Sequence, residues 1–190
     1  MKPAPEIYFP DRASLRAWLR EFHASHAPIW LVYDKKRPGL PQALSYDDIV
    51  EEALCFGWID SLPGRVDEAR TKVYLCPRKA RSVWSALNKR RIARLLELGL
   101  MTPAGQAKID AAKADGSWTV LDAAEAGLIP DDLASALASN TKAKASFDAF
   151  PPGARKRIVM WVTAAKRAET RAKRVQTTVE HAAEGKRVVG

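Results

Sequence analysis

Residues able to do chemistry follow a glycine in the short stretch "FGWIDS", where Trp58 and Asp60 come directly after Gly57. Glycine lets the backbone turn sharply, and alternate residues of a strand point to the same face. We therefore expect Trp58 and Asp60 to share one face, where a carboxylate beside an indole can hold a cationic or hydroxyl-bearing ligand. Asp60 can equally pair with a nearby arginine while Trp58 packs in the core, and the residues leave both alternatives open.

A second candidate stretch, "CPRKARSVWSALN", combines a cluster of cations with a predicted helix start. Arg78, Lys79 and Arg81 precede Ser82, which we predict to be the N-cap of a helix. A helix start presents free N–H groups and the positive end of a dipole, so this pattern favours an anion site. The stretch lacks the glycines of a phosphate-binding loop, which argues against nucleoside triphosphates. The alternative is that the cations form a solvated rim.

The two stretches are expected to lie side by side. The predicted strands "WIDSL" and "TKVYLC" are joined by a link too short for a crossover helix, so they should pair antiparallel. That pairing would bring both stretches to one pocket for an anionic small molecule or partner. The ligand-binding residues predicted on this basis are Trp58, Asp60, Arg78, Lys79, Ser82, Trp84 and Asn88.

The sequence shows no set of catalytic or metal-binding residues. Ser85-x-x-Asn88 departs from the Ser-x-x-Lys pattern of acylating enzymes, and neither a Gly-x-Ser-x-Gly elbow nor a His-Glu-x-x-His motif occurs. Cys55 and Cys76 have the wrong number and spacing for zinc. We therefore predict no catalytic residue, metal or cofactor, and favour a binding protein over an enzyme. An enzyme acting on a phosphorylated or carboxylated substrate, with Asp60 as base, is the remaining alternative.

The net charge of +9 is concentrated in two regions. Residues 64–94 hold ten Lys or Arg against two acids, and residues 141–190 hold twelve against four, so each region carries +8. Clustered positive charge attracts polyanions, including nucleic acid, although it can also be a solvated surface. The residues predicted to form a basic surface are Arg90, Arg91, Arg94, Arg167, Arg171 and Arg174. Nucleic-acid binding through them is an alternative function.

The elements that must position these residues indicate an α+β fold. Hydrophobic residues make up 47% of the 190-residue chain, which is typical of a globular protein. We predict a small antiparallel sheet with helices over residues 1–129, followed by an all-helical module over residues 130–190. Ser45 and Asp48 have capping-box spacing at a helix start, and Gly57 is placed to end that helix. No apolar run is long enough for a membrane span and no signal peptide begins the sequence, so a cytoplasmic location is expected; oligomeric state is not specified.

Taken together, the motifs resemble the YdeI/OmpD-associated, or bacteriocin-protection, family. The resemblance extends from about Phe9 to Arg187 and is carried by "EEALCFGWIDS", "PRKARSVWSALNKRR", "LLELGLMTPAGQAKIDAAKADGSW", "IPDDLASAL" and "AAKRAETRAKRV". It implies a role in tolerance of bacteriocins and cationic antimicrobial peptides, and it brings no catalytic residue. Direct capture of cationic peptides fits a net charge of +9 poorly, because like charges repel. The implied role in stress tolerance is therefore expected to be indirect.

Overall fold

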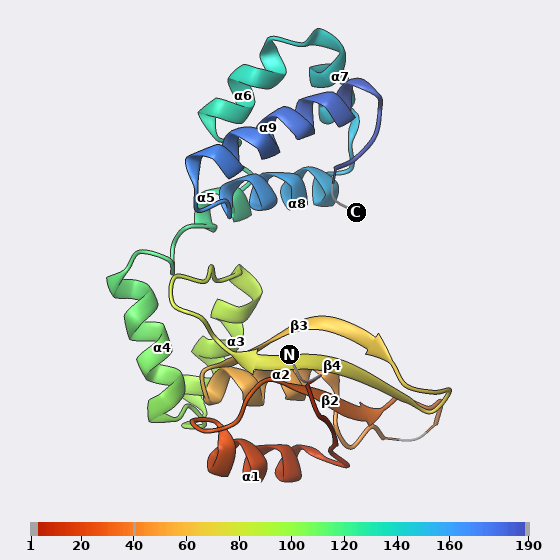
Figure 1. Cartoon of the computed structure of the whole chain (residues 1–190), viewed down its shortest axis with the longest axis vertical. Coiled ribbons are helices and arrows are strands. Elements are labelled where there is room, and N and C mark those ends of the chain that lie inside the picture. The colour runs from red at the N-terminus through yellow and green to blue at the C-terminus, as the bar shows by residue number, and fades with distance from the viewer. Residues whose placement is uncertain (1–3, 40, 189–190) are drawn as a thin grey trace. The chain divides into compact units, whose positions relative to one another are not determined.

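A computed structural model of the chain describes residues 4–39 and 41–188. The chain divides into two compact units, which are coloured red to green and green to blue in Figure 1. The sheet unit comprises Met1–Ser82 and Leu87–Asp115, and the helical unit comprises Val83–Ala86 and Gly116–Gly190. The predicted boundary at Ile129 lies within the helical unit.

The sheet unit is built on four strands in the order β1-β2-β4-β3. Their bounds are β1 Glu6–Tyr8, β2 Ile29–Asp34, β3 Trp58–Arg65 and β4 Arg70–Pro77. β1 runs parallel to β2, and β4 lies antiparallel to both β2 and β3. The predicted antiparallel pairing of the strands in "WIDSL" and "TKVYLC" is therefore confirmed.

Among the described residues of the sheet unit, three of the four helices begin at a capping side chain. The four are α1 Arg12–Phe22, α2 Tyr46–Cys55, α3 Ala86–Glu97 and α4 Pro103–Ala114, and those with the cap are α1, α2 and α4. Ser45 accepts a hydrogen bond from the Asp48 amide at 3.1 Å, and the Asp48 carboxylate accepts one from the Ser45 amide at 2.9 Å. This capping box fixes the start of α2. Gly57 follows α2 with a φ of +74°, a left-handed conformation that suits glycine and turns the chain into β3.

The two faces of the sheet differ in burial. Ile29, Leu31, Val73 and Leu75 share one face and are at most 3% exposed. Figure 1 shows α1 and α2 on one side of the sheet, and their buried side chains complete this core. On the opposite face Val32 is also buried, but Tyr8 is 45% exposed and Asp34 and Arg70 are exposed, so much of this face is open within this unit.

The helical unit has its own core. Its helices are α5 Asp122–Glu125, α6 Asp131–Ala138, α7 Thr141–Ala149, α8 Pro152–Thr163 and α9 Ala168–Ala183. Leu133, Leu137, Phe147, Ile158 and Val162 are each at most 1% exposed and belong to one apolar cluster. The predicted α+β class, with a sheet first and helices afterwards, is confirmed.

Two details of the sequence prediction were wrong. The helix expected to start at Ser82 starts at Ala86, because residues 79–82 form a separate turn instead. The strand β1 was not predicted, since three residues are too few to show an alternating pattern. The hydrogen bonds between β1 and β2 stabilise this short strand, although its sequence alone does not predict it.

Candidate functional site

The first predicted site residue, Trp58, lies in the core. It is 1% exposed, and its indole Nε1 donates a hydrogen bond to the His23 carbonyl at 2.9 Å. Its ring meets that of Trp18 edge-on, with centroids 5.9 Å apart. The structure thus shows the alternative in which Trp58 packs in the core. Its side chain contacts Trp18 and His23 and forms no ligand-accessible surface.

Asp60, two residues later, is partly exposed and has a defined partner. It accepts a hydrogen bond from the Tyr46 hydroxyl at the start of α2. Burial raises the pKa of Tyr46, and the hydrogen bond to Asp60 raises it further. Tyr46 therefore stays protonated at neutral pH and remains a donor. The contact fixes the start of β3 to α2.

Arg78 is the most buried cation of the predicted site, with 5% exposure. Its backbone amide donates to the Gly57 carbonyl at 2.9 Å, which joins the end of β4 to the turn before β3. Burial lowers the pKa of Arg78 to about 10, against the opposing field of Asp60. The guanidinium is still charged at neutral pH, so the end of β4 carries a fixed positive charge.

The residues after Arg78 form an exposed turn, which we call the basic turn (Arg78–Ser82). Lys79 and Arg81 are both exposed, and the Ser82 hydroxyl donates to the Lys79 carbonyl at 2.8 Å. Arg81 has a φ of +57° and is the one non-glycine residue with positive φ among residues 4–39 and 41–188. A left-handed conformation strains residues with a Cβ, so the hydrogen-bonded turn must hold Arg81 in place. The sequence placed Arg81 among the cations of this stretch but not in the predicted ligand set, and its left-handed backbone leaves no sequence signal.

The predicted pocket as a whole is divided between the units. Ser82 is part of the basic turn and is not a helix cap, so its predicted role at a helix start was wrong. Trp84 belongs to the helical unit, where it is 3% exposed and packs 5.1 Å from the Trp118 ring. The Asn88 amide oxygen accepts from Arg91 at 3.0 Å. The sheet unit therefore brings together Asp60, Arg78, Lys79 and Ser82, and the other predicted residues serve local packing or hydrogen bonding.

Most of the predicted basic surface is engaged within the fold. Arg91 pairs with Asp47, and Arg94 lies 3.3 Å from Glu51, so both join α3 to α2. Arg171 binds both carboxylate oxygens of Asp132, at 2.6 and 2.9 Å, and joins α9 to α6.

Arg174 engages α8 instead: its guanidinium lies 4.8 Å from the centroid of the Trp161 ring. Arg90 and Arg167 are exposed. Four of the six predicted cations thus contact a side chain of another helix and stabilise the packing of helices.

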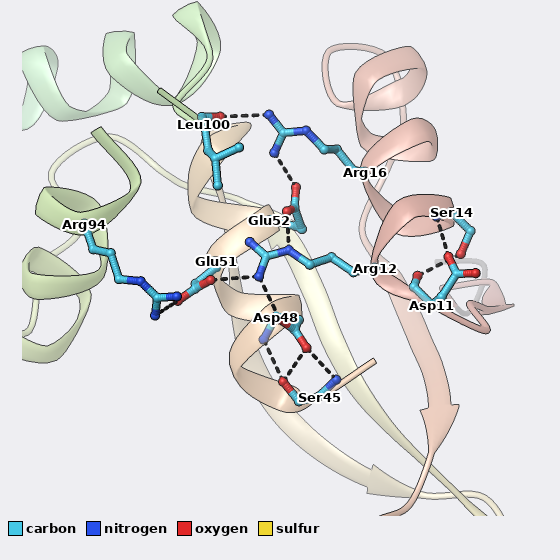
Figure 2. Close-up of polar contacts among 10 residues, drawn as sticks. All are labelled: Asp11, Arg12, Ser14, Arg16, Ser45, Asp48, Glu51, Glu52, Arg94 and Leu100. Atoms are coloured by element: carbon cyan, nitrogen blue, oxygen red, sulfur yellow. Dashed lines mark hydrogen bonds and ion pairs between the residues drawn. The ribbon is translucent and has the colours of Figure 1, made fainter. Parts of the chain in front are cut away.

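A second group of charges holds α1 to α2, and Figure 2 shows it with Arg94 of α3 beside it. We call it the ionic network; its members are Arg12, Arg16, Asp48, Glu51, Glu52 and Arg94. The Glu52 side chain is 1% exposed and accepts from Arg12 and Arg16, each at 2.7 Å. Arg16 also donates to the Leu100 carbonyl at 2.8 Å. No pattern in the sequence indicates this network, because its partners lie far apart in the chain.

Among the described residues, neither a metal site nor a membrane-spanning helix has a candidate. Within residues 4–39 and 41–188, no three His, Cys, Asp or Glu side chains are grouped so that they could hold a metal ion. In the same part of the chain, no helix has the length and apolar character to cross a bilayer.

Comparison with known families separates the chain into two matches. Residues 7–108, more than half of the chain, match the family described as a domain of unknown function (DUF8412). The chain belongs to the DUF8412 family. Residues 128–185 of this DUF8412 protein match the family described as "Bacteriocin-protection, YdeI or OmpD-Associated" (OmdA).

The predicted resemblance to bacteriocin-protection proteins is thus confirmed, and the OmdA match lies in the helical unit. The motifs "EEALCFGWIDS" and "PRKARSVWSALNKRR", assigned to the same family, fall instead in the DUF8412 match, and the motif at residues 95–118 begins in it. No curated protein and no solved structure matches the DUF8412 protein.

Proposed function

We propose that this DUF8412 protein is a binding protein, not an enzyme, and that its ligand is an anion held at the basic turn. The observation that supports the proposal is the pair of exposed cations in a turn of strained geometry. Lys79 and Arg81 flank Ala80, and no carboxylate in the described part of the chain pairs with either of them. In contrast, Arg91 and Arg94 have carboxylate partners in the same unit.

The buried charge of Arg78 strengthens this argument. Its guanidinium is held at the end of β4 in a position of low exposure, where a positive charge acts on its surroundings with little screening by water. Asp60 opposes it with one negative charge. Lys79 and Arg81 add two exposed positive charges at this end of the sheet, and an anion would compensate them.

The description of the OmdA family is our ground for proposing a link between this binding and bacteriocin protection. A chain with a net charge of +9 repels cationic peptides, so protection by direct capture is disfavoured. We propose that the contribution to stress tolerance is indirect and passes through the anionic ligand.

A binding titration tests the proposal. Labelled polyphosphate would be titrated by fluorescence anisotropy at about 50 and 200 mM salt. The variant Lys79→Ala/Arg81→Gly removes both exposed cations of the basic turn. The control Arg157→Ala/Lys173→Ala removes the same charge from two exposed positions of the helical unit.

We expect the first variant to bind about tenfold more weakly at the lower salt, and the control to lose about twofold or less, because counterion release depends on local phosphate contacts. An equal loss of affinity in the two variants would show that polyphosphate responds only to the net charge of the protein. That result would contradict a site at the basic turn.

A further inference from the structure

The side of the sheet away from the core carries a row of aromatic and cationic side chains, which we call the open face. The strand registers pair Tyr8 with Val32, Trp30 with Tyr74, and Val32 with Lys72, so these alternate residues share a face. Its members on β1, β2 and β4 are Glu6, Tyr8, Trp30, Val32, Asp34, Arg70, Lys72, Tyr74 and Cys76. Tyr8 is 45% exposed, and Trp30 and Tyr74 are half-buried.

Two aromatic rings of the open face, those of Trp30 and Tyr74, form one connected platform with Lys72. The Trp30 and Tyr74 rings are 5.2 Å apart at an angle of 72°. The Lys72 ammonium lies 5.0 Å from the centroid of the Trp30 ring and pairs with Glu6. Rings that are held in place in this way lose little entropy when a flat ligand stacks on them.

Gly64 of β3 makes room for this platform. A Cβ at this position would lie 2.9 Å from Cγ of Lys72, so the lysine stem would have to shift, and 3.1 Å from Cζ3 of Trp30, which is a tight contact. The missing side chain therefore lets the indole and the lysine stem lie across the sheet as far as β3. Glycine in a strand interior weakens the strand, so its presence here is consistent with a packing requirement on the open face.

Cations lie at both ends of the platform. Lys35, Lys36 and Arg37 follow β2 and are exposed, whereas Arg70 at the start of β4 is 46% exposed and pairs with Asp67. The basic turn follows the other end of β4. The eight residues of β4 separate the two groups of cations by about 26 Å at 3.3 Å per residue.

We propose that the open face binds single-stranded nucleic acid, with bases stacked on Trp30, Tyr74 and Tyr8 and phosphates against the cations at the two ends. The contact at one end rests on the proposed function of the basic turn, whereas the stacking does not. Aromatic side chains on an exposed sheet, flanked by positive charge, are how proteins bind unpaired strands without reading a sequence. A proline-rich peptide would use the rings but would gain nothing from cations at both ends.

Trp30→Ala is the decisive variant. A labelled oligothymidylate of about ten nucleotides matches the span of the open face and would be titrated by anisotropy at about 50 mM salt. An abasic strand with the same number of phosphates separates stacking from charge. The control is Trp161→Ala, because Trp161 is also half-buried under a cation but lies in the helical unit.

We expect Trp30→Ala to weaken oligothymidylate binding about tenfold or more and Trp161→Ala to leave it unchanged, since one stacked base contributes on this scale. Trp30→Phe keeps a ring and should retain most of the binding, which guards against misfolding of the alanine variant. The abasic strand should bind weakly and be insensitive to Trp30→Ala.

The outcomes separate the two proposals. If Trp30→Ala binds oligothymidylate as the unchanged protein does, or if the abasic strand binds equally well, the open face is not a stacking surface and this inference fails. The proposed anion site at the basic turn would not be contradicted by that result, because it is tested separately with polyphosphate and the double variant. Preference for duplex DNA, or binding of a proline-rich peptide in place of the oligonucleotide, would also overturn the inference. Absence of binding to every probe would overturn both proposals.

Discussion

The ionic network and the basic turn are both rich in arginine, yet the structure uses them in opposite ways. In the network, Arg12 and Arg16 face Glu52, whose side chain is 1% exposed, and three cations meet three carboxylates. In the basic turn, Lys79 and Arg81 project from an exposed and strained segment. The comparison shows that partners, more than the number of cations, distinguish a structural region from a candidate binding site.

The largest expected effect is on the network. Glu52→Gln removes the buried carboxylate charge that Arg12 and Arg16 share, and breaking an ion pair at a buried group costs about 3 kcal/mol of unfolding free energy. Urea denaturation measures the loss. Glu21→Gln, at an exposed position of α1, is the control and should change stability by less than about 0.5 kcal/mol. Similar stabilities for the two variants would show that the network adds nothing to the fold.

A smaller effect, of opposite sign, is expected in the basic turn. Arg81→Gly relieves a left-handed conformation, so we expect the variant to be about 0.5–1 kcal/mol more stable than the unchanged protein. Arg81→Ala loses the same charge but retains the strain, and its stability should be nearly unchanged. Thermal or urea unfolding of both variants checks the difference. If Arg81→Ala gains as much as Arg81→Gly, charge repulsion and not backbone strain is being relieved.

The smallest effect concerns pH. Burial raises the pKa of Asp48, but hydrogen bonds from Ser45 and Arg12 outweigh it, and the pKa in the folded protein is below the ordinary value. The contribution of Asp48 to stability is therefore complete above the unfolded pKa of about 3.9 and is lost as pH falls through the lower folded pKa. Asp48→Asn should flatten the fall of unfolding free energy in this acid range. An unchanged slope would assign the acid sensitivity to other carboxylates.

Local signals in the sequence predicted much of the fold. The helix starting after Ser45 was marked by a capping box, whose partners are three residues apart and need no tertiary contact. The antiparallel pairing of β3 and β4 followed from the short link between them. Of the predicted site residues, Asp60, Arg78, Lys79 and Ser82 lie in one unit, whereas Trp58 and Trp84 are core residues.

The sequence by itself thus determined the helix caps, the main strands, the α+β class and the resemblance that the OmdA match confirms. Only the tertiary structure decided which cations are neutralised, because Arg12 finds Glu52 forty residues away. It also decided the register that places Trp30 beside Tyr74 and the left-handed backbone at Arg81. These features depend on contacts between distant segments, and composition and periodicity describe only neighbours along the chain.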